Sequence, residues 1–216
     1  MKSQLHEAAS DAGRPDPALL AVSKRHSSNA IRELLSVGQR DFGENYVQEA
    51  TDKVRELADE RADLQWHLIG HLQSNKAGVA AGVFDWIHTI DRVKLLEPLN
   101  KGREGRAPLN VLIQVNIDDE DSKSGCAPDE IDMLADAIAG YANLRLRGLM
   151  TIGAMHDDAE KARPTFRRMK GLFDELRAKH SSVDTLSMGM SGDYPVAIAE
   201  GATMIRVGTA IFGERR

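Results

Sequence analysis

Short hydrophobic runs rich in Val, Ile and Leu recur along the whole chain, and each is too short to form a helix of ordinary length. Polar or glycine residues follow nearly every run, which is typical of strands that end in loops. The run within RDFGE has the weakest hydrophobic pattern. We therefore expect strands at 18–23, 40–43, 65–69, 84–89, 109–117, 144–150, 184–188 and 203–207.

The segments between these runs carry hydrophobic residues at helical spacing, so strands and helices alternate. Several strands are hydrophobic on successive residues, as expected for strands buried on both faces of a parallel sheet. Eight such units behind a leading helix predict an α/β protein, a single-domain (β/α)₈ TIM barrel over residues 1–216. A doubly wound open sheet is the alternative. Helices are expected at 28–37, 46–59, 93–100, 128–139, 159–179 and 193–200.

The composition is that of an ordinary globular protein, with 42% hydrophobic and 28% charged residues and no linker or low-complexity segment. A net charge of −5 with scattered basic residues does not predict nucleic-acid binding. No hydrophobic run is long enough for a membrane span, and the single cysteine, Cys126, allows no internal disulfide. We therefore expect a cytoplasmic protein, and a monomer because no unmatched hydrophobic face stands out.

The run LLAVSK, residues 19–24, ends in a lysine where a buried strand is expected to finish. In a barrel, the functional groups come from the carboxyl ends of the strands and the following loops. An amine that is partly desolvated at this rim has a lowered pKa, and its neutral form can make a Schiff base with an aldehyde. The alternative for Lys24 is a structural lysine whose stem lies along the strand end.

Glycine-bearing stretches follow both of the last two expected strands, within SMGMSGDYPVAIAEG and MIRVGTAIFG. Gly189, Ser191 and Gly192 lie between a strand and a helix, where backbone N–H groups and the helix dipole favour an anion. Gly208 and Thr209 hold the same place after the next strand. Barrels often bind phosphate in these two loops, although plain turns have a similar composition.

Arg206 is a cation near the end of an otherwise hydrophobic strand, close in sequence to the proposed phosphate site. Its structural interpretation is an ion pair with a carboxylate such as Glu200. Its functional interpretation is a guanidinium that donates to a heteroaromatic nitrogen and keeps that nitrogen unprotonated. A cofactor with an aldehyde, a phosphate and a ring nitrogen would use Lys24, the glycine loops and Arg206 together, and pyridoxal 5′-phosphate (PLP) has all three groups.

Six stretches carry a family resemblance when taken together: LLAVSK, FGENYVQEA, WHLIGHLQSNK, VNIDDEDSKSG, GLMTIG and LSMGMSGDYPVAIAEGATMIRVGTAIFG. Over residues 18–213 the chain resembles the YggS/PROSC family of PLP-binding proteins, also called PLP homeostasis proteins. That family is similar in fold to the amino-terminal barrel of alanine racemase. The resemblance implies that Lys24 holds PLP as a Schiff base and that Arg206 serves the ring nitrogen. It also implies phosphate ligands at Ser191, Gly208 and Thr209, and further pocket positions at Asn45, His67, Met188 and Gly189.

Other residues have weaker interpretations. His67 and His71 are four residues apart, but without a matching carboxylate we expect a pocket role for them and no metal site. Lys123, within DDEDSKSG, belongs either to the pocket rim, as a second cofactor-binding lysine, or to a solvated turn. The carboxyl end stops at GERR, where some relatives continue with a few more residues.

The resemblance implies a carrier or reservoir in intracellular PLP homeostasis, with no catalytic residue, and with PLP-dependent apo-enzymes as the partners that would receive the cofactor. The alternative is a PLP-dependent racemase, which needs acid–base groups on both faces of the substrate Cα. No context marks Tyr46, Tyr141 or Tyr194 as such a base, and we expect no second domain to supply one. A further alternative treats Lys24 as an aldolase lysine and the glycine loops as a sugar-phosphate site.

Overall fold

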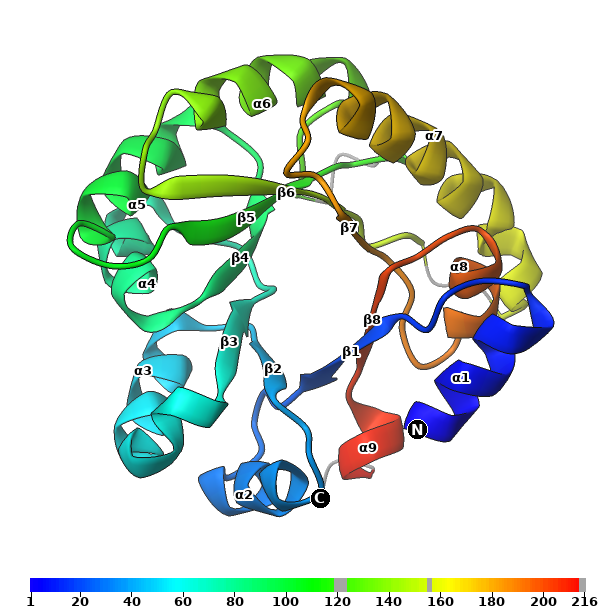
Figure 1. Cartoon of the computed structure of the whole chain (residues 1–216), viewed down its shortest axis with the longest axis horizontal. Helices are drawn as coiled ribbons and strands as arrows, with labels where there is room; N and C mark the ends of the chain where they lie inside the picture. The colour runs from blue at the N-terminus through cyan, green and yellow to red at the C-terminus, as the bar shows by residue number, and fades with distance from the viewer. Residues whose placement is uncertain (119–123, 155–156, 214–216) are drawn as a thin grey trace.

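The computed structural model describes residues 1–118, 124–154 and 157–213, and within them eight parallel strands close into a barrel (Figure 1). Each strand pairs with the next, and β8 pairs with β1, where Leu20 lies opposite Arg206. The closure confirms the predicted (β/α)₈ barrel, and the open-sheet alternative is wrong. The strands are β1 (Ala18–Val22), β2 (Asp41–Glu44), β3 (Gln65–Leu68), β4 (Trp86–Ile90), β5 (Leu109–Gln114), β6 (Leu144–Met150), β7 (Thr185–Ser187) and β8 (Met204–Val207).

Helices form the layer outside the strands, with α1 packed against α8 (Figure 1). The helix predicted at 46–59 is divided, because α3 ends at Glu56 and a 3₁₀ turn follows at Ala58–Asp63. The sequence AGVAAGV of α4 has no polar face, so its pattern did not predict a helix. No helix in the described ranges is both long and hydrophobic enough to cross a bilayer. The helices are α1 (Lys2–Asp11), α2 (Ser28–Ser36), α3 (Val47–Glu56), α4 (Ala77–Val83), α5 (Leu96–Gly102), α6 (Ile131–Ala139), α7 (Arg163–Lys179), α8 (Tyr194–Ala199) and α9 (Thr209–Phe212).

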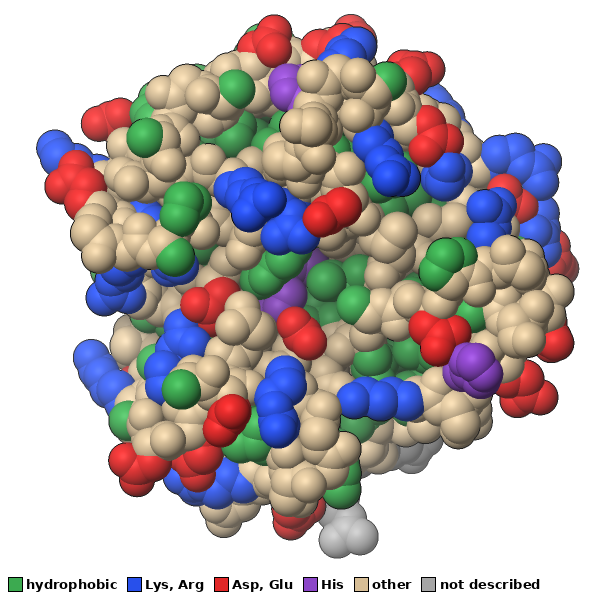
Figure 2. All heavy atoms as spheres, in the orientation of Figure 1, with side chains coloured by type: hydrophobic (Ala, Val, Ile, Leu, Met, Phe, Trp, Pro, Cys, Tyr) green, Lys and Arg blue, Asp and Glu red, His purple; other side chains and the backbone are tan. Residues whose placement is uncertain are grey.

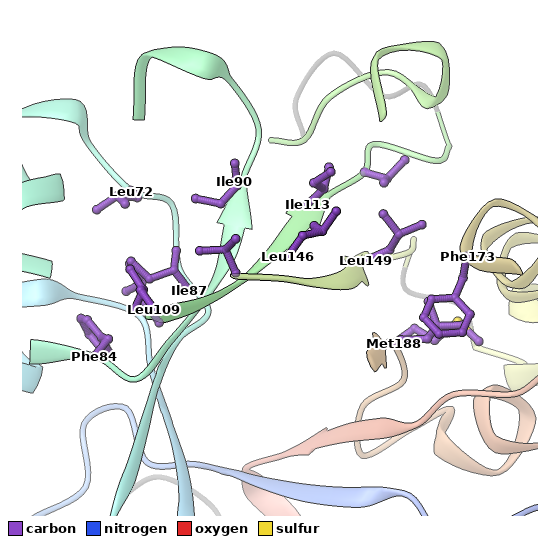
Figure 3. Close-up of a cluster of buried hydrophobic side chains, with 14 of the residues drawn as sticks. Leu72, Phe84, Ile87, Ile90, Leu109, Ile113, Leu146, Leu149, Phe173 and Met188 are labelled. Carbon is purple, nitrogen blue, oxygen red and sulfur yellow. The ribbon is translucent and has the colours of Figure 1, made fainter. Parts of the chain in front are cut away.

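Side chains alternate between the two faces of each strand, and this alternation divides the core into two parts. Leu19 and Ala21 of β1 belong to the large cluster that lies between the strands and the helices, part of which is shown in Figure 3. Leu20 and Val22 of the same strand belong to a small separate cluster that also contains Ile69 and Met204. Only every second residue of a strand can therefore face the interior of the barrel.

Polar and aromatic side chains fill the barrel interior around His67 of β3. His67 places its Nε2 atom 3.1 Å from Asp41 and its Nδ1 atom 3.0 Å from Nε2 of His88, and its ring stacks on Trp86. Burial lowers the pKa of His88 well below its ordinary value, so this ring is neutral. Figure 2, a view down the shortest axis of the molecule, shows histidine and hydrophobic side chains in the centre with charged side chains around them. Side chains therefore fill the middle of the barrel.

Candidate cofactor-binding site

A pocket of about 210 Å³ opens at the carboxyl ends of the strands. The segments that end or follow β1, β2, β3, β6, β7 and β8 all contribute to it, so the pocket spans most of the barrel rim. Six of the nine residues predicted from the sequence line it. The lining residues are Val22, Lys24, His26, Asn45, Ile69, Ile152, Met190, Ser191, Arg206, Gly208, Thr209 and Gly213.

Lys24 lies two residues beyond the end of β1, on the same alternating face as Val22. It is half-buried, and it follows a serine whose backbone N–H donates to the carbonyl oxygen of Gly43. The next residue, Arg25, has a φ of 64°, the left-handed conformation that residues other than glycine seldom adopt. The chain therefore turns sharply at Lys24 and leaves this side chain on the pocket wall.

Arg206 is a buried cation on the inner face of β8, with an exposure of 4%. Its guanidinium donates to the hydroxyl of Ser187 at 2.9 Å and to the carbonyl oxygen of Thr151 at 2.8 Å. Glu200, the carboxylate considered from the sequence, instead pairs with Arg163 and a second surface arginine. Within the described residues Arg206 forms no ion pair, and burial lowers its pKa to about 10. It is therefore still cationic near neutral pH.

The last two loops bring hydroxyl and backbone groups to the pocket. Ser191 precedes α8, and the backbone N–H of Met190 donates to the Asp193 side chain at 2.6 Å, which fixes this loop. Gly208 caps the amino end of α9, and Thr209 is its first residue. Because α8 has six residues and α9 four, the helix dipoles add less than the sequence analysis assumed. The hydrogen-bond donors that these loops offer are single backbone N–H groups and the hydroxyls of Ser191 and Thr209.

Asn45 reaches the pocket from the end of β2, and its backbone packs directly on Gly70. A Cβ at position 70 would lie 2.1 Å from the Asn45 carbonyl oxygen, so no larger residue fits without moving a strand end. The hydroxyl of Thr89 donates to the Gly70 carbonyl oxygen at 3.0 Å and fixes the same loop from the other side. Gly70 therefore sets the distance between two adjacent segments of the rim.

Replacing Gly70 by alanine is expected to lower the free energy of unfolding by roughly 1–3 kcal/mol, because the added methyl group overlaps backbone atoms that cannot rotate away. Urea unfolding of the purified variant measures the change. The matched control is Gly171→Ala on α7, where a Cβ meets no atom within 4 Å and alanine is the better helix former. Equal stability of the Gly70→Ala variant and the parent protein would contradict this account of the rim.

Three residues predicted for the site, His67, Met188 and Gly189, are not among those that line this pocket, so their contact with a cofactor stays a prediction. His67 is fully buried inside the barrel, beside Asp41 and His88. Met188 is fully buried in the outer cluster, close to Phe173 of α7 (Figure 3). Gly189 has a φ of 89° and packs on α8, where a Cβ would lie 2.5 Å from that of Ala197. Alternation explains Met188: it is one residue beyond Ser187, which faces inward.

The sequence analysis missed several lining residues, among them His26, Ile152 and Met190. Met190 lines the pocket three residues beyond the end of β7, after Gly189, whose φ of 89° ends the strand alternation. The ring of His26 stacks on that of Phe212 of α9, with centroids 4.3 Å apart. The contact joins the first loop to the last helix, and no local pattern in the sequence could have predicted it.

No group of three residues suited to hold a metal ion occurs among residues 1–118, 124–154 and 157–213. His67 and His71 have different surroundings, since His67 is buried and the His71 side chain is half exposed beside Asp91. Lys123 and residues 214–216 lie outside the described residues, so the predictions about a second lysine site and the GERR end stay predictions.

A family model described as the alanine racemase amino-terminal domain matches residues 1–216. The fold and the rim lysine thus define a barrel of this class. Alanine racemase from Clostridium difficile shares the fold alone, with a TM-score of 0.67 at 15% identity over 99% of this chain and 56% of that chain. PipY of Synechococcus elongatus, solved with PLP bound, has a TM-score of 0.83 at 40% identity and covers 97% of this chain and 100% of its own.

Curated relatives match the chain over almost its full length. The pyridoxal phosphate homeostasis protein of Escherichia coli K12 is 48% identical over an alignment of 219 residues, gaps included, that covers 100% of this chain and 94% of the relative. The protein of the same name from Pseudomonas aeruginosa is 49% identical over 217 residues, 99% and 92% of the two chains. The chain therefore belongs to the family of pyridoxal phosphate homeostasis proteins, as the sequence resemblance predicted.

Proposed function

We propose that this protein holds PLP covalently on Lys24 and serves as a carrier or reservoir in PLP homeostasis. One observation supports this most directly: the amine of Lys24, the guanidinium of Arg206 and the donors of the last two loops line a single pocket. PLP would supply an aldehyde there. The Lys24 nitrogen would form a C=N bond with the aldehyde carbon, and the aldehyde oxygen would leave as water, so the step needs no oxidant or reductant.

The residues of the pocket fit the groups of PLP. A guanidinium has five N–H donors, and contacts to Ser187 and Thr151 use two of them, so further donors are available for a ring nitrogen. Because Arg206 stays cationic near neutral pH, it would keep that nitrogen unprotonated. The phosphate would bind at Ser191, Gly208 and Thr209, for which we predict contacts from hydroxyl and backbone groups, and Asn45 would contact the cofactor from β2.

Two observations favour a carrier over a racemase. None of the three tyrosines lines the pocket: Tyr46 borders a neighbouring hollow, Tyr194 lies beside α1, and Tyr141 packs on the outer core. A ring nitrogen that faces a permanent cation is also a poorer acceptor of electrons than a protonated ring, which disfavours carbanion chemistry. Within this proposal the chain acts as one monomeric domain in the cytoplasm, and its partners are PLP-dependent apo-enzymes.

A test of the carrier role uses alanine of a single enantiomer. The purified, PLP-loaded protein should absorb visible light and should leave the optical purity of the alanine unchanged over many hours, as free PLP does at the same concentration. Mixing the loaded protein with an apo-enzyme should restore the activity of that enzyme. Racemisation well above the free-PLP control would instead favour the racemase alternative, and failure to bind PLP would exclude both.

A further inference from the structure

The residues on both sides of Lys24 are held by side chains of β2 and α3. Ser23, which precedes Lys24, is fully buried; its hydroxyl donates to Oε1 of Glu44 at 2.6 Å and its carbonyl oxygen accepts from Nζ of Lys53 at 2.8 Å. Arg25, which follows Lys24, donates its backbone N–H to Oε1 of Glu49. Contacts from outside the loop therefore fix the backbone immediately before and after the lysine.

Lys53 links these contacts into one network. Its ammonium group donates to Ser23, to Oε1 of Glu44 at 2.7 Å and to Oε1 of Glu49 at 2.8 Å, so all three of its N–H donors are used. The Lys53 and Glu44 side chains are 9% and 0% exposed, and burial raises the pKa of Glu44 although the Lys53 charge opposes this. Buried ionic groups of this kind have a fixed geometry, because each loses much of its solvation.

The turn held by this network is strained. Arg25 is the only residue other than glycine with a positive φ among the described residues, a conformation that side chains with a Cβ disfavour. Its N–H donates to Glu49, which lies in the first turn of α3 and has a 24% exposed side chain. The surrounding contacts must maintain such a conformation, and strain of this kind is concentrated at functional sites.

We propose that Glu49 and Lys53 are positioning residues that orient Lys24 for covalent capture of an aldehyde. Neither lines the pocket, so neither is expected to contact the cofactor. Glu49 holds the turn after the lysine, Lys53 holds the serine before it, and together they limit the directions that the Lys24 side chain can take. The inference rests on the proposed function, because it assigns a cause to the reactivity of Lys24.

A second carboxylate of α3 provides a matched comparison. Glu56 accepts a hydrogen bond from the hydroxyl of Ser28 at 2.6 Å, where α2 begins. It thus joins α3 to the same β1–α2 connection as Glu49 does, but four residues beyond Lys24. If Glu49 and Glu56 serve only to hold α3 against the β1–α2 connection, replacing either one should change the reactivity of Lys24 to the same extent.

The experiment compares Glu49→Met, Glu49→Gln and Glu56→Met. Methionine keeps the stem of the side chain and removes both acceptor oxygens, whereas glutamine keeps one acceptor oxygen with two lone pairs. Each unloaded protein is melted to establish folding and is then mixed with PLP, and the rise of visible absorbance gives the rate of covalent capture. Borohydride reduction and peptide mass spectrometry identify the labelled lysine.

The rate should fall about tenfold in Glu49→Met, within the roughly 10²-fold that a 1 Å misplacement of a reacting group costs. It should stay within about twofold of the parent in Glu56→Met, and Glu49→Gln should recover most of the loss. Equal rates in the two methionine variants would overturn the inference. If Glu49→Met does not fold, Glu49→Ala is measured against Glu56→Ala under the same criterion. If the parent itself carries no label on Lys24, the proposed function fails instead.

Discussion

Replacing Lys24 by alanine is expected to abolish covalent capture of PLP. The parent protein should retain about one PLP per chain after borohydride reduction, since reduction turns the C=N bond into a stable amine. The variant should retain none, because no other lysine lines the pocket among the described residues. Arg206, Ser191 and Thr209 remain, so reversible binding should persist in weakened form. Peptide mass spectrometry of the reduced proteins measures the outcome directly.

Lys76→Ala is the control for this prediction. Lys76 borders a neighbouring hollow that shares Asn45 with the pocket, so it tests whether a nearby amine can capture the aldehyde. We expect this variant to keep its label on Lys24. Equal labelling of Lys24→Ala at another position, for example Lys123, would show that the assignment of the lysine is wrong, although the protein would still be a PLP binder.

The barrel could be predicted from the sequence because its strands are hydrophobic on successive residues. That pattern requires cover on both faces, and eight repeats of it leave few arrangements other than a closed parallel sheet. The parallel arrangement also predicted most of the residues that line the pocket. Lys24, Asn45, Ser191 and Gly208 all follow strands, and the parallel arrangement brings the carboxyl ends of all strands to one rim.

The depth and direction of individual side chains could not be predicted in this way. His67 is on the inner face of β3 and Ile69 follows the strand on the same side, but only Ile69 lines the pocket. Met188 was placed in the pocket because it follows a strand, whereas the alternation from Ser187 turns it outward. Contacts between residues far apart in the chain, such as that of Glu49 with the backbone N–H of Arg25, leave no local sequence pattern.

Two basic residues line the pocket, an arrangement that suits a bound anion. Lys24 and Arg206 both line it, and Arg206 is buried with no carboxylate partner in the described part of the chain, which makes its positive charge unfavourable. A hydrophobic side chain of similar volume would pack at position 206 with less loss of solvation free energy. A buried arginine at this position therefore needs a compensating role. In the proposed function, a ligand that accepts hydrogen bonds from Arg206 would compensate for the burial of this charge.

Replacing Arg206 by methionine should therefore weaken PLP binding without unfolding the barrel. Hydrogen bonds to charged groups contribute about 1.5–3 kcal/mol, and each 1.4 kcal/mol is a tenfold change in affinity, so we expect a loss of roughly 10- to 100-fold. Titration of the unloaded variant with PLP, followed by absorbance, gives the affinity. Thermal melting of the same sample verifies the fold, since Ser187 and Thr151 lose a partner.

Arg206→Lys separates the charge from the geometry of its donors. A lysine keeps the positive charge but cannot reach Ser187, Thr151 and a ring nitrogen at once, so an affinity between those of the parent and the methionine variant is expected. Arg163→Met, which removes a partly exposed partner of Glu200 on the outside of the barrel, should leave the affinity within about twofold. A folded Arg206→Met variant that binds PLP as tightly as the parent would remove Arg206 from the site. Full affinity in Arg206→Lys would assign its role to charge alone.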